Sequence, residues 1–284
     1  MMNFNDIFKE IKNSPDKHPR SCKDYKRIES RLIETVKNSG FVSGGSGNDN
    51  YGPFGELLFP YCKMGAIDSL DLFGLDEMII FSYYYNNRNR YNKVVDVGAN
   101  IGLHSILMSK SGYKVEAYEP DPKHMKIMEK NFKLNSVDSV NIYQVAVSDV
   151  KHKTKFIRVL GNTTSSHIAG SKDNSYGDLD TFDVDVVSVK EIFKNSDFIK
   201  MDVEGEEAKI ISSTTKENWE NVDMILEVGT ESNKKVIYDH LKSIDVNMFS
   251  QKLAWKKAQG IDDIPASYKE GSLFVSQDNQ MLWS

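Results

Sequence analysis

The sequence predicts a doubly wound α/β fold, in which helices cover both faces of a mostly parallel sheet. A short β-branched strand at 93–97 runs into a turn flanked by Gly98 and Gly102, and an apolar helix follows. From this turn to about residue 244, predicted strands and helices alternate, which indicates parallel strands joined by right-handed crossovers. Glu119 ends the second strand 21 positions after Gly98, where nucleotide-binding folds carry the acid that binds ribose hydroxyls.

Length and composition indicate one large core and exclude some partners. A chain of 284 residues with 39% hydrophobic content can bury one substantial core, and we expect an N-terminal extension over 1–90 and a ligand-binding domain over 91–284. The net charge of −5 argues against a nucleic acid partner, because binding to a phosphate backbone needs clustered Lys and Arg. Cys22 and Cys62 form neither a disulfide framework nor a zinc-ligand pattern, which favours a reducing compartment.

The sequence shows no targeting or membrane segment. The N-terminal residues have no apolar signal core, and no apolar run is long enough to span a bilayer. We therefore expect a soluble, cytoplasmic protein without a membrane partner.

The first ninety residues are expected to form helices joined by loops. Residues 1–20 are polar and end in a proline-containing loop. Apolar residues at helical spacing predict an amphipathic helix over 23–37, which either packs on the domain or covers the substrate. The glycine-rich stretch 43–53 is predicted to be a flexible linker or mobile loop. The predicted elements that follow are a strand at 54–61 and a helix at about 70–86, in which Asp76 and Glu77 could reach a cofactor.

The glycine turn at 98–102 is the predicted ligand site. Free backbone N–H groups at the start of the following helix favour a negatively charged group, whereas Asp96 favours a positive or hydroxyl-bearing one. A dinucleotide site usually has a third glycine between the outer two, because the backbone must approach a pyrophosphate closely, but this chain has Asn100. S-adenosylmethionine fits better, since its carboxylate suits the helix N-terminus, its ammonium group suits Asp96 and its ribose suits Glu119. An NAD(P)-dependent oxidoreductase and a non-catalytic nucleotide-binding module are the alternatives.

A polar insertion at 161–180 interrupts the predicted alternation after the third strand. It is too long for a tight connection and too polar for the core, so we expect it to border the substrate mouth. His167 within it is expected to be an exposed loop histidine, with an acid–base role as the alternative. Before it, Ala146 is expected to form a wall against the adenine, and Asp149 either binds the adenine amine or caps a turn. The predicted elements here are helices at 103–111 and 122–134 and strands at 114–118, 140–145, 156–159 and 182–189.

Three acids follow the next two predicted strands. Asp202 and Glu204 follow a strand at 197–201, and Glu227 follows a strand at 222–226. In open parallel sheets the ligand crevice lies at the carboxyl ends of the strands, so these acids are placed for chemistry. A short helix at 189–194, a helix at 236–244 and two closing strands at 246–253 and 272–275 complete the predicted fold.

Six motifs follow one another along the chain: Val95–Gly102, Tyr118–Pro122, Asn131 with Asn135, Ala146–Asp149, Ile199–Glu206 and Ile225–Glu227. Their order and spacing resemble the FkbM-type family of S-adenosylmethionine-dependent methyltransferases over about residues 93–276. The resemblance implies a Rossmann-like class I methyltransferase fold, with a seven-stranded, mostly parallel sheet, an antiparallel last strand and helices on both faces. It also implies S-adenosylmethionine as the cofactor and S-adenosylhomocysteine as the product.

The residues and the resemblance together predict a cofactor site along the carboxyl edge of the sheet. Its members come from the glycine turn and from the ends of the neighbouring strands. They are Asp96, Gly98, Ala99, Asn100, Ile101, Gly102, Glu119, Pro120, Ala146, Asp149 and Asp202.

The predicted reaction is O-methylation of a small-molecule or sugar hydroxyl. A sulfonium methyl group is already activated, so the enzyme must align the acceptor, exclude water and take a proton from the hydroxyl. The candidate proton acceptors are Asp202, Glu204 and His104. The chain lacks the Asn/Asp-Pro-Pro-Tyr segment that resembles methylators of base amines, which favours oxygen as the acceptor. We do not favour a divalent cation held by Asp202, Glu204 and Glu227, because strand-end acids also bind ligand hydroxyls directly or cap helices.

Overall fold

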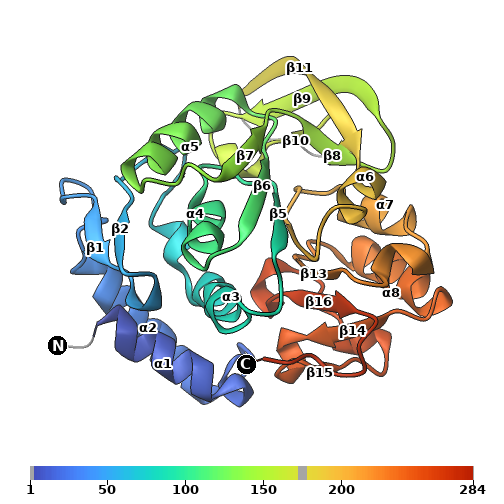
Figure 1. Ribbon diagram of the computed structural model, residues 1–284, viewed down its shortest axis with the longest axis horizontal. Coiled ribbons are helices and arrows are strands. Elements are labelled where there is room, and N and C mark those ends of the chain that lie inside the picture. Colours follow the sequence, from blue (N-terminus) through green and yellow to red (C-terminus); the bar gives the residue numbers. More distant parts are fainter. Residues whose placement is uncertain (1–2, 172–177, 284) are drawn as a thin grey trace.

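The computed structural model describes residues 3–171 and 178–283, and an eight-stranded sheet forms its centre (Figure 1). The strand order is β15-β14-β16-β13-β12-β5-β6-β7. Strands β13, β12, β5, β6 and β7 are parallel, and β16 is antiparallel to both of its neighbours. The strands are β5 (Lys93–Val97), β6 (Lys114–Tyr118), β7 (Val140–Tyr143), β12 (Phe198–Met201), β13 (Asp223–Leu226), β14 (Asn247–Ser250), β15 (Lys256–Lys257) and β16 (Leu273–Ser276).

The expected α/β class, the mostly parallel sheet and its antiparallel last strand are confirmed. The predicted number of seven strands is wrong, because the sheet has eight. The additional strand is β15, which pairs antiparallel with β14 at the edge of the sheet. The chain reverses between these two strands through Ala254 and Trp255, both of which have positive φ angles. Non-glycine residues rarely adopt this conformation, so the local sequence gave no sign of a turn here.

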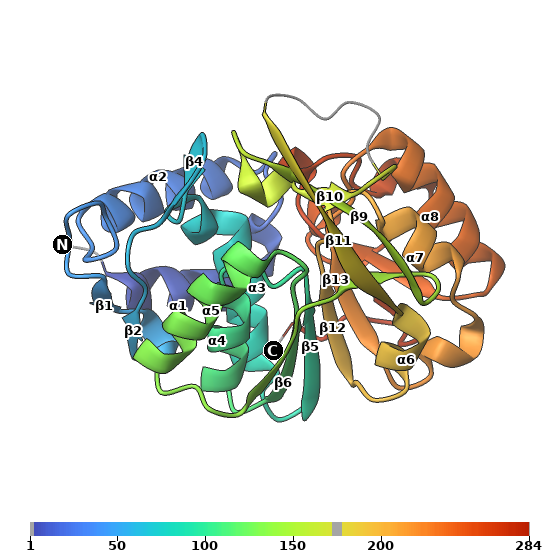
Figure 2. The same ribbon diagram turned by 90° about the horizontal axis from the view of Figure 1, so that it is seen from above.

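Helices cover both faces of the sheet (Figure 2). Three of them pack on one face and three on the other, and side chains of the strands alternate between two hydrophobic clusters: Val94 belongs to one and Val95 to the other. Helix α8 begins earlier than predicted because Thr230 caps it, accepting the N–H of Asn233 at 3.1 Å. The first face carries α3 (Leu75–Asn86), α4 (Leu103–Lys110) and α5 (Pro122–Leu134), and the second carries α6 (Val189–Phe193), α7 (Glu207–Ser212) and α8 (Glu231–Ser243).

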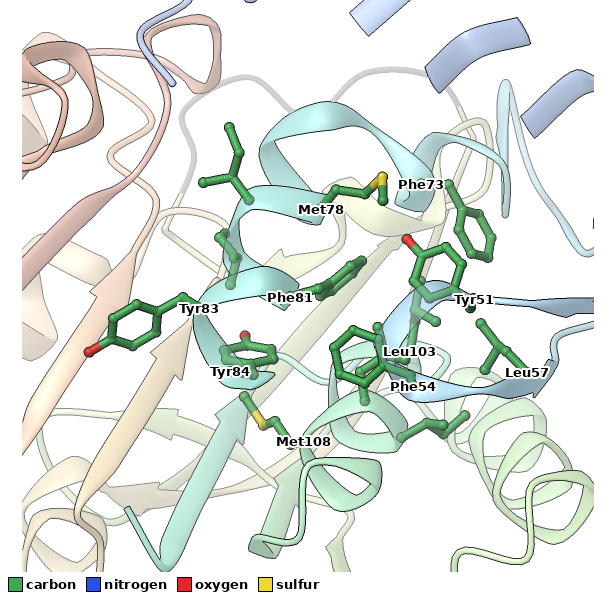
Figure 3. Close-up of a cluster of buried hydrophobic side chains, with 14 of the residues drawn as sticks. Tyr51, Phe54, Leu57, Phe73, Met78, Phe81, Tyr83, Tyr84, Leu103 and Met108 are labelled. Atoms are coloured by element: carbon green, nitrogen blue, oxygen red, sulfur yellow. The ribbon is translucent and has the colours of Figure 1, made fainter. Parts of the chain in front are cut away.

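Helix α3 lies inside the protein rather than on its surface. Its apolar residues are buried on all sides, and Figure 3 shows Met78, Phe81 and Tyr84 among aromatic side chains from the N-terminal segment and apolar side chains of α4. One hydrophobic cluster thus runs from residue 4 through α3 to the central sheet. The division of the chain at residue 90 stays a prediction, although this cluster crosses it.

The N-terminal segment contains a helix that the sequence did not reveal. Residues 1–20 were expected to be polar and to end in a loop, with no helix assigned to them, but α1 (Phe4–Asn13) buries its apolar face in the core. A capping box starts it, since Asn3 and Asp6 each accept the other's backbone N–H. Helix α2 (Lys23–Lys37) has the predicted bounds. The remaining strands of this segment are β1 (Asn48–Asn50), β2 (Glu56–Leu58), β3 (Lys63–Met64) and β4 (Ile67–Asp68).

The glycine-rich stretch 43–53 was expected to be a linker or mobile loop. Its first residues, 43–46, are exposed, but its end is anchored in the core. Tyr51 is fully buried, and the backbone of Gly52 lies so close to the Phe8 ring that a Cβ there would collide with it. Glycine at position 52 therefore allows close contact between α1 and this loop.

Strands on both sides of the polar insertion form a second sheet with β10, which lies within the insertion, in the order β10-β9-β11-β8. Its hairpin strands extend further than predicted, because β9 and β11 pair along their whole length. His167 was expected to be exposed, but only 1% of its surface is accessible and its Nδ1 lies 2.9 Å from the Ser165 carbonyl oxygen. Residues 172–177 of the predicted insertion lie outside the described residues. The strands are β8 (Ala146–Ser148), β9 (His152–Val159), β10 (His167–Ile168) and β11 (Leu179–Ser188).

In the described parts of the chain, none of the helices has the length and apolar composition needed to cross a membrane.

Candidate active site

The glycine turn between β5 and α4 brings two strand ends into close contact. Gly98 and Gly102 have φ angles of +78° and +90°, and a Cβ at Gly98 would collide with the backbone oxygen of Asp202. Asn100 between them has a φ of +51°, a conformation that Asn tolerates better than most residues. Only glycine at position 98 therefore lets the turn pack against the end of β12.

A cavity of about 230 Å³ opens beside this turn, at the carboxyl ends of the central strands. Seven of the residues predicted from the sequence line it: Gly98, Asn100, Glu119, Pro120, Ala146, Asp202 and Glu204. The structure therefore brings the glycine turn, the end of β6 and the end of β12 around one space. This agrees with the general position of ligand crevices in open parallel sheets.

Glu119 lies at this cavity with both carboxylate oxygens engaged by backbone. One oxygen accepts the Asn100 N–H and the other accepts the Asp121 N–H, each at 2.8 Å. His124 lies next to it, with Nδ1 3.7 Å from the Glu119 carboxylate. Burial lowers the pKa of His124, but the hydrogen bond and charge of Glu119 outweigh burial and raise it.

The polar insertion and the N-terminal segment close the cavity from the other side. His124 Nε2 lies 3.0 Å from the hydroxyl of Thr163, which lines the cavity on a short turn of the insertion. Gly65 and Asn162 form an isolated bridge that joins the insertion to the β3–β4 hairpin. The insertion contributes Thr163, Thr164, Ser166 and Ile168, β9 before it contributes Phe156, and the N-terminal segment contributes Ile67, Asp71, Leu72 and Glu77.

Six predicted residues do not line this cavity. His104 is buried, with Nδ1 2.9 Å from the Tyr84 hydroxyl and Nε2 2.9 Å from the Glu77 carboxylate. Asp149 pairs instead with Lys209 at 3.2 Å. The other four are buried, either within the turn or at the end of β5: Asp96, Ala99, Ile101 and Gly102.

A second, smaller cavity of about 40 Å³ lies at the ends of β12 and β13. It shares Glu77 and Asp202 with the first cavity, so these two residues mark the boundary between them. Asp202 is the more accessible at this boundary, with 40% of its side chain exposed. The other polar residues that line it are Asp76, Lys200, Glu227, Tyr268 and Ser272.

Two acids near the end of β12 have raised pKa values. Burial, followed by the negative charges of Asp202 and Glu204, raises the pKa of Glu227 to about 9. Burial also raises the pKa of Glu207 to about 7, although it accepts the N–H groups of Val203 and Gly205 at 3.2 and 3.0 Å. Glu207 thus accepts hydrogen bonds from the turn before α7.

The structure does not assemble a metal site from these acids. Within residues 3–171 and 178–283, no three His, Cys, Asp or Glu side chains are arranged to hold a metal ion.

Residues 96–252, more than half of the chain, match the model of the methyltransferase FkbM domain. The chain belongs to the FkbM methyltransferase family. A curated relative is the methyltransferase sdnD of Sordaria araneosa, 26% identical over 162 residues that cover 45% of this chain and 62% of that protein. Another is the ribosomal protein L11 methyltransferase of Acetivibrio thermocellus, 34% identical over 68 residues, 24% of this chain and 22% of that protein. The chain thus spans less than two thirds of either relative.

Two solved structures of methyltransferases also align with this FkbM family member. An O-methyltransferase from Bacillus cereus in complex with SAH is 10% identical, with a TM-score of 0.38 over 69% of this chain and 78% of that one. Precorrin-6y C5,15-methyltransferase from Geobacter metallireducens is 11% identical, with a TM-score of 0.38 over 70% and 86% of the two chains.

The sequence interpretation missed His124, Thr163 and Lys200 at this site. Nothing in the local sequence marks His124 or Thr163, because they meet only when the insertion folds back over α5. Lys200 did carry a signal: a lysine within the apolar strand of residues 198–201 needs a buried partner.

Proposed function

We propose that this FkbM family protein is an S-adenosylmethionine-dependent methyltransferase that transfers the methyl group to a hydroxyl oxygen of a small molecule or sugar. One observation carries the proposal: a single cavity brings together the glycine turn, the Glu119 carboxylate and the Asp202 carboxylate. Family membership supports methyl transfer over the alternative of hydride transfer to a nicotinamide.

The chemistry of the lining residues fits the cofactor. The side-chain oxygen of Asn100 is buried at the cavity, and no donor within the described residues bonds to it, so it can accept a hydrogen bond from a ligand. The Glu119 carboxylate suits ribose hydroxyls, and Ala146, Phe156 and Ile168 offer apolar walls to an adenine ring. Asp96, Ala99, Ile101 and Gly102 then support the turn from beneath, and Asp149 stays a prediction as an adenine partner.

Asp202 is the best placed proton acceptor for the hydroxyl. When bound, the cofactor supplies an activated methyl group, so the protein must exclude water and hold or remove one proton. Asp202 lies at the boundary of both cavities with its side chain partly accessible. Glu204 lines the cofactor cavity and is the second candidate. Glu227, with its pKa raised to about 9, keeps its proton at neutral pH and is a hydrogen-bond donor there.

His104 is a weaker candidate for the proton acceptor than either acid. Both of its ring nitrogens face partners, Tyr84 and Glu77, and it lines neither cavity. It would have to break one of these contacts before taking a proton from an acceptor.

The first test of the proposal is cofactor binding to a Glu119→Ala variant. Loss of charge-assisted hydrogen bonds to the ribose should weaken S-adenosylmethionine binding by about 1.5 to 3 kcal/mol, roughly tenfold to a hundredfold, in titration calorimetry. Glu129→Ala is the matched control, because Glu129 is an exposed glutamate on α5 that does not line the cavity.

Two results would contradict the proposed function. If the wild-type protein binds NAD(P) and not S-adenosylmethionine, the oxidoreductase alternative holds. If it binds S-adenosylmethionine but transfers no methyl group to any member of a glycan and metabolite panel, the non-catalytic module holds. An unchanged affinity of a folded Glu119→Ala variant would remove Glu119 from the site.

A further inference from the structure

Lys200 is a buried cation that none of the steps above uses. It lies within β12, opposite Asp96 of β5 on one side and Ile225 of β13 on the other. Only 8% of its side chain is exposed. A buried ammonium group is unfavourable unless it is paired and hydrogen-bonded. The contacts of Lys200 therefore indicate its role.

The partners of Lys200 come from three places around the site. Its Nζ donates to the Gly98 carbonyl oxygen at 3.3 Å and lies 3.5 Å from the Asp96 carboxylate and 3.9 Å from the Asp202 carboxylate. Gly98 begins the turn at the cofactor cavity, and Asp202 lines both cavities. One ammonium group thus contacts a fixed structural acid, the cofactor turn and the candidate proton acceptor.

Lys200 stays charged at this position. Burial lowers its pKa, but Asp96, Asp202 and Glu77 outweigh burial, so the pKa lies above its usual value. Within the described residues, it is the one cation that lies within 4.0 Å of the Asp202 carboxylate. Its charge therefore acts on both Asp96 and Asp202.

We propose that Lys200 is a positioning residue that couples the glycine turn to Asp202, so that cofactor binding depends on both. The proposal rests on the function proposed above. Balancing the charge of Asp96 is a separate role, because Asp96 is fully buried and also accepts a hydrogen bond from the Ser105 hydroxyl at 2.6 Å. The two roles predict different behaviour when Asp202 or Asp96 is changed together with Lys200.

The test is a double-mutant cycle on cofactor affinity, measured by titration calorimetry with S-adenosylmethionine. The variants are Lys200→Met, Asp202→Asn, both together, and Asp96→Asn with Lys200→Met, which leaves no buried charge unpaired. Thermal unfolding without ligand checks that each variant is folded. Lys216→Met is the control, because Lys216 forms an exposed ion pair with Asp245 away from both cavities.

If Lys200 couples the glycine turn to Asp202, Lys200→Met should weaken S-adenosylmethionine binding about tenfold in the wild-type background. In the Asp202→Asn background the same change should weaken it only about threefold. The Asp96→Asn, Lys200→Met variant should fold and still bind weakly. Equal losses in both backgrounds, or wild-type affinity in the variant without Asp96 and Lys200 charges, would overturn the proposal. If the wild-type protein does not bind S-adenosylmethionine at all, the proposed function fails instead, which is a distinguishable outcome.

Discussion

The two ends of β12 and β13 carry acids in opposite situations. At the amino ends, Asp197 accepts the backbone N–H groups of Asn92 and Lys93 at 2.8 and 2.9 Å. Asp223 accepts the Tyr91 hydroxyl at 2.6 Å and Arg90 Nη2 at 2.9 Å. These carboxylates tie strands and loops together.

At the carboxyl ends, Asp202 and Glu227 line a cavity instead. The nearest cation to Asp202 is Lys200 at 3.9 Å, which is closer to Asp96. Glu227 faces mainly other acids, and its pKa is raised accordingly. Acids at the amino ends thus hold the fold. Under the proposed function, Asp202 and Glu227 at the carboxyl ends face the ligand-binding cavities.

Asp223→Ala should give the largest effect on stability. It removes the carboxylate that accepts the Tyr91 hydroxyl and that shares Arg90 with Asp278, which should cost about 1.5 to 3 kcal/mol of unfolding free energy. Denaturant unfolding measures this loss, and calorimetry should show unchanged S-adenosylmethionine affinity. A weakened cofactor affinity in the folded variant would contradict the distinction between the amino and carboxyl ends of β12 and β13.

Asp202→Asn should show the opposite behaviour. If Asp202 takes the proton from the acceptor, turnover should fall about a hundredfold or more, while cofactor affinity falls at most about tenfold and the midpoint of thermal unfolding hardly moves. The measurement uses an acceptor found by screening methyl transfer to glycans and metabolites. Normal turnover in this variant would move the role to Glu204, whose Gln variant is the parallel test.

Glu227→Gln should change the pH dependence of the unfolding free energy. The native pKa is about 9, above the ordinary value of 4.5, so the native protein keeps a proton that the unfolded chain releases, and stability is lost as the pH rises between these values. The Gln variant removes this loss, so between pH 5 and pH 8 it should lose less stability than the wild-type protein. Unfolding curves at pH 5 and pH 8 measure the difference, and equal slopes in both proteins would show that Glu227 is ionised in the native state.

Much of the fold and part of the site could be predicted because their signals are local. Helix α2, β5, β6 and α5 have the predicted bounds, since each has its own apolar periodicity and its own start or stop residues. Gly98 and Glu119 were also predictable, because a glycine turn and an acid at the next strand end have fixed positions in a parallel sheet.

The remaining features depend on segments that are distant in the sequence. Helix α1 forms part of the core only because Gly52 lets Phe8 approach the loop at 43–53. His124 reaches Thr163 across 39 positions, and Lys200 reaches Gly98 across 102. Local sequence patterns do not predict such contacts.

The sequence by itself determined the family, the α/β class, the glycine turn and the set of acids at the strand ends, because periodicity, glycine placement and strand order are properties of the chain. Only the tertiary structure decided which of those acids have partners and which remain for a ligand. Asp202 and Asp223 look alike in the sequence, as single acids at strand ends. They differ because hydrogen bonds and ion pairs are satisfied by neighbours in space, and those neighbours are brought together only by folding.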